Sequence, residues 1–171
     1  MLEPLCTRGV LSFQWVTMDE ECGRNTTLLT HLDSAGRYYM AEVPHSTRGW
    51  RKRPHTAIPP AGPRGPTPTR ERLVPGSPKA QRADALAKTL SGKAWHRFTL
   101  QEGTKGPVVV EIAAIRVTTV EDSLPGREEW FVFRRQPGYM HELKTYRCNA
   151  PADTPLEKLA RMTAMRWPVE T

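Results

Sequence analysis

A segment rich in proline, glycine and arginine, residues 45–83, divides this chain into two parts of different character. Its central stretch, RKRPHTAIPPAGPRGPTPTRERLVPGSP, cannot bury enough apolar surface to offset the entropy lost on ordering it. We therefore predict a flexible basic loop there, with folded structure on either side. At 171 residues the chain is long enough for one ordinary domain with a large insertion and too short for two full domains.

The residues before this loop read as strand, helix and strand. Residues 10–18 are apolar nearly throughout, as expected for a strand buried on both faces of an α/β sheet. A short amphipathic helix follows, capped by Asn25 or Thr26 and stopped by Gly36, and residues 37–43 form a second strand. We expect the two strands to be parallel, with a right-handed crossover.

The residues after the loop indicate an antiparallel β module followed by a helix. A brief helical stretch is expected at 83–90, and turn signals such as LPGRE and QPGY separate four predicted strands, at 95–100, 107–120, 129–135 and 144–149. Thr154 is predicted to cap the final helix, with Pro155 in its first position. Pro168 must kink or restart that helix, because proline lacks a backbone donor.

The positive charge is concentrated in the predicted loop. The chain carries a net charge of +7, and a basic protein of this kind usually has an anionic partner, most often nucleic acid. Backbone phosphates of DNA could be contacted by Arg48, Arg51, Lys52, Arg53 and, in the EGTKGP turn, Lys105. A solvated charged loop without a partner is an equal alternative. Trp50, Trp95 and Trp130 could stack on bases, although tryptophans more often belong to a core.

Several classes of protein are disfavoured. The start of the chain lacks the features of a signal peptide, and no run of about 18 apolar residues is present, so we expect a cytoplasmic protein that makes no membrane contact. The three cysteines and five histidines show no zinc-binding spacing. Lys105 lacks the spacing of a P-loop, which argues against nucleotide binding.

Two acidic residues occupy positions typical of metal-ligating carboxylates. Asp19 directly follows the first predicted strand, and open α/β sheets bind ligands at the carboxyl ends of their parallel strands. Glu170 follows Arg166 by four residues, which puts both on one face of a helix. Position alone favours simpler interpretations, a turn or capping aspartate and a surface glutamate.

Longer stretches of the sequence resemble one family. The segment RWPVE resembles the arginine-x3-glutamate part of the tyrosine-x2-arginine-x3-glutamate-x6-lysine signature in a large class of bacterial insertion-sequence DDE transposases. WVTMDEECGR resembles the family's stretch around the second catalytic aspartate, and EGTKGPVVVE and YRCNAPADTP resemble its β-rich insertion. The resemblance spans most of the chain, and the basic loop is its least typical part.

The resemblance implies an α/β fold with an incomplete ribonuclease H-like core, made of the strand-helix-strand unit and the C-terminal helix and interrupted by an antiparallel β-rich insertion. Residues 1–44 and 151–171 would form the partial catalytic core, 45–83 the basic flexible loop and 84–150 the β-rich insertion module.

The resemblance also implies functional roles. Asp19 and Glu170 would be catalytic and metal-ligating, and Arg166 would support Glu170 or a phosphate. Intact members use Mg²⁺ or Mn²⁺ for in-line attack on phosphodiesters of transposon ends and target DNA, and a homodimer is expected of them.

Three features depart from the family pattern. Only Glu3 is acidic ahead of Asp19, Thr163 replaces the signature tyrosine, and the signature lysine would fall beyond Thr171. We therefore expect a fragment of a transposase that carries two of three carboxylates and is inactive alone. One alternative is a non-catalytic DNA-binding remnant that uses the basic loop and the β module. Another is a product that does not fold stably, because half a ribonuclease H sheet leaves an unpaired edge.

Overall fold

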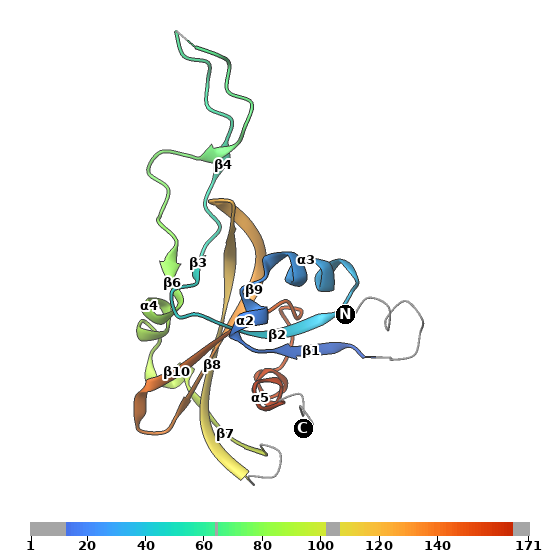
Figure 1. The fold of residues 1–171 in the computed structure, drawn as a ribbon. Coiled ribbons are helices and arrows are strands. Elements are labelled where there is room, and N and C mark those ends of the chain that lie inside the picture. Colours follow the sequence, from blue (N-terminus) through green and yellow to red (C-terminus); the bar gives the residue numbers. More distant parts are fainter. Residues whose placement is uncertain (1–12, 64, 102–106, 166–171) are drawn as a thin grey trace.

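The computed structural model describes residues 13–63, 65–101 and 107–165, and most of these residues surround one mixed sheet (Figure 1). The sheet has eight strands in the order β1-β2-β10-β9-β8-β3-β6, with β7 also paired to β8. Its strands are β1 (Trp15–Met18), β2 (Tyr38–Val43), β3 (Arg48–Trp50), β6 (Gln81–Arg82), β7 (His96–Gln101), β8 (Pro107–Glu121), β9 (Leu124–Gln136) and β10 (Tyr139–Cys148). The helices are α2 (Glu20–Gly23), α3 (Thr26–Ser34), α4 (Ala83–Lys88), the short 3₁₀ turn η1 (Gly92–Ala94) and α5 (Leu156–Ala164). The chain is a mixed α/β protein.

The predicted strand-helix-strand unit is confirmed. β1 and β2 are parallel, in register from Trp15 opposite Tyr38 to Met18 opposite Ala41. Between them α3 begins after Asn25, whose side chain accepts a hydrogen bond from the Leu28 amide at 3.1 Å. Residues 10–12 of the predicted first strand lie outside the described residues.

The antiparallel character of the second part is also confirmed, with one correction. β8, β9 and β10 form a meander of long antiparallel strands. The turn between β8 and β9 is not LPGRE, which lies within β9. It is formed instead by Asp122 and Ser123, which both have positive φ (49° and 68°). Two such residues match the right-handed twist of the flanking strands. The QPGY turn is confirmed, with Gly138 at φ 83°.

The two parts predicted from the sequence share one sheet. β10 pairs antiparallel with β2, so the strand-helix-strand unit and the meander are continuous. The described residues between 45 and 83 also differ from a plain loop. β3 and β6 join the far edge of the main sheet, and β4 (Thr56–Ala57) pairs with β5 (Arg72–Leu73) in a separate two-stranded sheet. The division of the chain into domains stays a prediction.

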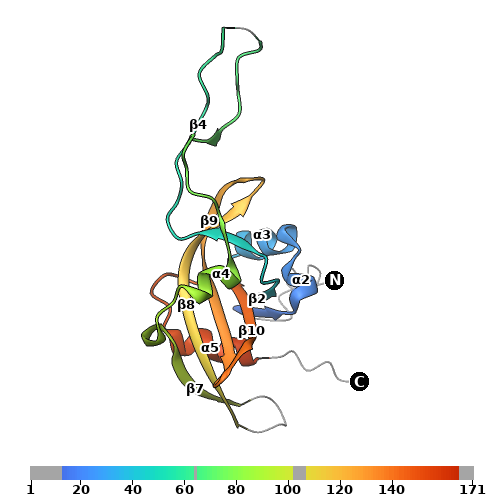
Figure 2. The same ribbon diagram turned by 90° about the vertical axis from the view of Figure 1, so that its left-hand side faces the viewer.

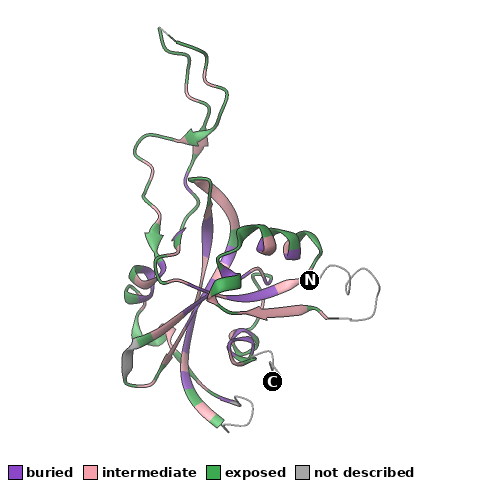
Figure 3. Cartoon of the chain, viewed as in Figure 1, coloured by how far each residue is buried: buried purple, intermediate pink, exposed green. Residues whose placement is uncertain are grey.

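Helices cover both faces of the sheet. Along β2, Tyr39 and Ala41 belong to a core cluster with Leu29 and Leu32 of α3, whereas Met40 belongs to a cluster with α5. Side chains of a strand point alternately to opposite faces, so α3 and α5 lie on opposite sides. α4 packs on the α3 side, over alternate residues of β8 and β9. Figure 3 shows the buried residues concentrated where helices and sheet meet.

The last helix begins one residue later than predicted. Pro155 is extended (ψ 141°) at the N-cap, and no side chain caps the helix. The Pro155 carbonyl accepts bonds from the amides of Lys158 and Leu159. The predicted cap by Thr154 is therefore wrong, because the fixed φ of proline does not by itself commit its ψ to the helical region. Pro168 lies outside the described residues.

Candidate active site and DNA-binding surface

Asp19 lies where β1 ends and α2 begins. It is the N-cap of α2, its Oδ1 accepts a hydrogen bond from the Cys22 amide at 3.0 Å, and its carboxylate is exposed. The hydrogen bond from the Cys22 amide holds the pKa of Asp19 below its usual value of 3.8. The side chain is therefore ionised at neutral pH and accessible at the carboxyl end of a parallel strand. Capping, the simpler interpretation, is confirmed as one role, and it leaves the carboxylate accessible to a cation.

Gly23 holds α2 against the sheet. A Cβ built on Gly23 would lie 2.0 Å from the carbonyl oxygen of Glu42 in β2. Only glycine permits this approach, because any side chain would overlap the strand. Gly23 directly follows Cys22, whose amide donates the hydrogen bond to the Asp19 carboxylate. The close contact with β2 therefore lies next to the residue that orients Asp19. The helix that carries Asp19 at its start is thus fixed relative to β2.

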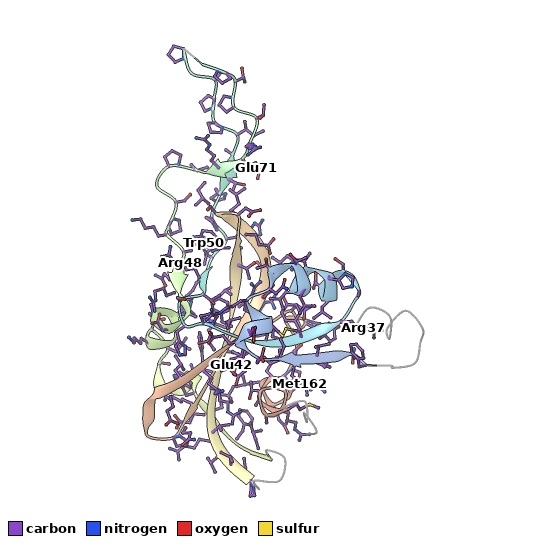
Figure 4. The ribbon with its side chains drawn as sticks, in the orientation of Figure 1. Arg37, Glu42, Arg48, Trp50, Glu71 and Met162 are labelled. Carbon is purple, nitrogen blue, oxygen red and sulfur yellow. The ribbon has the colours of Figure 1, made fainter. Side chains whose placement is uncertain are left out.

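The nearest acidic residue on β2 is already paired. The register places Met18 opposite Ala41, so Asp19 lies at the level of Glu42. Both oxygens of Glu42 accept from Lys144 Nζ, each at 3.1 Å; Figure 4 labels Glu42 beside the centre of the sheet. Sequence reasoning missed this pair, although a glutamate in an apolar strand is a signal that could have indicated it. Among the described residues, no group of three or more His, Cys, Asp or Glu side chains could hold a metal ion. Asp19 therefore fits a metal as one oxygen ligand that requires others.

Glu170 and Arg166, predicted as catalytic and supporting residues, lie outside the described residues. The end of α5 is described, and there the carbonyl of Thr163 accepts from Arg134 Nη1 at 2.9 Å. Arg134 pairs with Lys144 of β10, one step beyond the pairing of Thr145 with Val43, the last residue of β2. α5 thus ends at the level of the carboxyl end of β2.

Because β1 and β2 are parallel, α5 ends at the same end of the sheet as Asp19. Glu170 follows Met165 by five positions, and an extended chain over that interval spans at most about 17 Å. The sequence therefore limits how far Glu170 can lie from this end of the sheet.

A buried ion pair lies on the α3 face and takes no part in this site. Glu129 and Arg147 have relative exposures of 1% and 7%. Arg147 donates to both Glu129 oxygens at 2.8 Å, and Tyr39 donates its hydroxyl to Glu129 Oε1 at 2.7 Å. Burial, and next the charge of Glu129, raise the pKa of Tyr39 far above its usual range. The group joins β2, β9 and β10 and is closed to solvent.

The residues predicted to bind DNA have unequal roles. Arg48, Arg51 and Lys52 are exposed around β3, and Figure 4 labels Arg48 and Trp50 there. Arg53 instead donates to the carbonyls of Gly126 and Pro125 at 2.7 and 3.1 Å. It fastens the loop to the β8–β9 hairpin. Lys105 lies outside the described residues.

The three tryptophans are structural. Trp50 is 4% exposed and donates to the Pro78 carbonyl at 2.8 Å. Trp130 donates to the Pro151 carbonyl at 3.0 Å, and Trp95 packs under the guanidinium of Arg135, 3.8 Å from its ring centre. The expectation that such residues belong to a core or its margin is confirmed, because Trp50 is buried and Trp95 and Trp130 pack against the core clusters.

The described residues contain no helix long and apolar enough to cross a membrane. Comparison with known proteins gives one family match, over residues 1–107, to the family described as DDE superfamily endonuclease. No curated protein and no solved structure matches the chain. The matched region contains β1, Asp19, α2, α3, β2 and the basic segment, and it covers more than half of the 171 residues. The chain therefore belongs to the DDE superfamily endonuclease family.

Proposed function

We propose that the chain is part of an insertion-sequence transposase that cleaves and joins DNA strands with divalent metal ions. Membership of the family implies a nucleic acid substrate and divalent metals in general. The observation that carries the proposal is the exposed, ionised carboxylate of Asp19 at the carboxyl end of a strand in a parallel pair. In this proposal Asp19 and Glu170 are the catalytic, metal-ligating carboxylates, and Arg166 orients Glu170 or a phosphate.

The chain's own residues would prepare Asp19 for a hard cation. Mg²⁺ or Mn²⁺ would polarise the phosphodiester and activate the attacking oxygen when bound. Carboxylate oxygens suit these ions. The Cys22 amide orients the Asp19 carboxylate and keeps it ionised, and the contact of Gly23 with β2 prevents its helix from shifting.

We also propose that this chain alone supplies an incomplete ribonuclease H-like core and is inactive by itself. Within the described part of the chain, β1 pairs only with β2 and leaves its other edge without a strand. A further strand that carries the first aspartate of the family would pair there. The end of α5 at the Asp19 end of the sheet supports the convergence of Glu170 on the same site.

Manganese binding tests the proposed ligands directly. We expect Asp19→Asn and Glu170→Gln each to weaken Mn²⁺ binding at least about tenfold, since even groups that only support a ligand contribute 10–100-fold. Glu21→Gln is a matched control, because Glu21 is exposed two residues from Asp19 and its substitution removes the same charge. Equal weakening by all three variants, or none by Asp19→Asn, would remove the support for this site.

A second candidate function is a non-catalytic DNA-binding remnant. It is favoured by the exposed cations of the basic segment, among them Lys52, Arg70, Arg72 and Lys79. Salt-dependent DNA binding together with Mn²⁺ affinity that the Asp19→Ala/Glu170→Ala double variant does not weaken would support this candidate over a nuclease.

A further inference from the structure

Residues 51–80 are here called the arm, and its described residues project away from the body of the protein in both views of the ribbon (Figures 1 and 2). The base of the arm is anchored on both of its segments, the one that leads out from the body and the one that returns to it. On the outgoing segment Arg53 is hydrogen-bonded to the β8–β9 hairpin, and on the returning segment the Pro78 carbonyl accepts a hydrogen bond from buried Trp50. Further out, β4 and β5 pair, and the Val74 amide donates to the His55 carbonyl at 3.1 Å. The arm is thus an extension of two adjacent segments of the chain, and its base is held to the body by hydrogen bonds.

Proline makes the arm stiff. Eight of the chain's 16 prolines lie between residues 51 and 80. Proline restricts the backbone of the free chain as well as the bound one, so a proline-rich segment loses less entropy when a partner holds it. Such preorganisation favours binding through an extended surface.

The arm carries almost all of the net charge. It has seven basic residues and one acidic residue, so its net charge is +6, which leaves +1 of the total +7 for the rest of the chain. The single acid, Glu71, labelled on the arm in Figure 4, accepts from Thr56 Oγ1 at 3.2 Å. One of the seven, Arg64, lies outside the described residues.

The cations of the arm differ from those of the body in their pairing. Lys52, Arg70, Arg72 and Lys79 are exposed, and none of the four has an ion-pair partner among the described residues. In the body, by contrast, many cations are neutralised by acids, as in Arg97–Glu111, Lys144–Glu42, Arg147–Glu129 and Arg161–Glu157. The body therefore compensates its charge internally, and the arm presents its charge to solvent.

We propose that the arm binds the phosphate backbone of double-stranded DNA, outside the site around Asp19. This inference rests on the proposed function, which makes DNA the substrate. Duplex DNA carries a negative charge about every 1.7 Å along its axis, so a row of unpaired cations gains by displacing its counterions. About 15 residues lead out and about 15 lead back, which limits the reach to about 50 Å. That length is enough to follow one helical turn of about 34 Å. A second copy of the chain is disfavoured as occupant because the two arms would repel one another.

Salt dependence of metal-free DNA binding tests the arm. The full chain would be titrated in EDTA with a fluorescent duplex about three helical turns long, between about 50 and 200 mM salt. Each phosphate contact contributes about 0.9 to the slope of log K against log salt. We expect the Arg70→Gln/Arg72→Gln/Lys79→Gln variant to lower the magnitude of the slope by about 2.7, with an unchanged melting temperature.

The matched control is Lys88→Gln/Arg97→Gln/Arg161→Gln, which removes two arginines and one lysine from exposed positions of the body. It should leave the slope within about one unit of the wild type. Equal effects of both triple variants, an unchanged slope in the arm variant, or no binding by the wild type would each overturn the proposal.

Asp19→Asn separates the arm from the catalytic assignment. It should leave the metal-free slope unchanged while weakening Mn²⁺ binding. If Asp19→Asn weakens Mn²⁺ binding as expected but the arm variant keeps the wild-type salt slope, only the proposal that the arm binds DNA is refuted. If the arm variant lowers the salt slope as expected but Asp19→Asn does not weaken Mn²⁺ binding, only the proposed metal site is refuted.

Discussion

Replacing Gly23 by alanine would put a methyl group into the backbone of the neighbouring strand. The new Cβ would lie 2.0 Å from the Glu42 carbonyl oxygen, whereas ordinary contact begins at 3.4 Å. α2 would therefore have to move away from β2 by about 1.4 Å, the difference between these two values. β2 cannot move instead, because it pairs with β1 on one side and with β10 on the other.

The cost of this movement can be stated as a melting temperature. Overpacking of a tight contact costs about 1–3 kcal/mol. For a chain of this size each kcal/mol lowers the melting temperature by about 2–4 °C, so we expect Gly23→Ala to melt about 2–12 °C below the wild type. Thermal unfolding followed by circular dichroism measures this difference. Because Asp19 caps the displaced helix, Mn²⁺ affinity should fall in the same variant.

Gly92→Ala is the matched control. A Cβ on Gly92 meets no heavy atom within 4 Å, and Gly92 does not have a positive φ. Such a substitution should be neutral, or stabilise the fold by up to about 1 kcal/mol. If Gly23→Ala melted at the same temperature as Gly92→Ala, the packing of α2 on β2 and the argument for a fixed Asp19 would be refuted.

Three further predictions concern the sheet and the thiols. Arg147→Met should lower the free energy of unfolding in urea by about 3–5 kcal/mol, because it leaves the Glu129 charge buried without its partner, whereas the Glu129→Leu/Arg147→Met double variant should lose much less; equal losses in both would contradict the ion-pair explanation. Peptide mapping after alkylation should find exposed Cys22 modified in the folded chain and Cys148 protected, since burial raises the pKa of the Cys148 thiol to about 12; rapid modification of Cys148 would show that its site opens. Hydrogen bonds from Arg135 of β9, and next from Arg97 of β7, hold the pKa of Glu111 below its usual 4.5. The ionised Glu111 side chain therefore stabilises the fold above pH 4.5, and this stabilisation is lost as pH falls through the lowered pKa. Glu111→Gln should consequently show a shallower loss of stability in acid than the wild type.

Local patterns in the sequence were sufficient for much of the fold and for the position of Asp19. The β1-α3-β2 unit follows from apolar runs separated by a capped amphipathic helix, and the meander follows from β-rich runs separated by turns. The concentration of charge between residues 46 and 82 is likewise visible in the sequence alone. These features depend on neighbouring residues, whose periodicity and charge are written directly in the chain.

Only the tertiary structure decided which of these residues act together. The pairing of β2 with β10 joins segments about a hundred residues apart, and no local pattern encodes such a contact. Long-range packing also buried Trp50 and engaged Arg53 with carbonyl oxygens. Thus Arg53, which sequence alone could not distinguish from its exposed neighbours, became an anchor of the arm. Gly23 gained its importance in the same way, because the need for glycine there arises from the approach of a second strand.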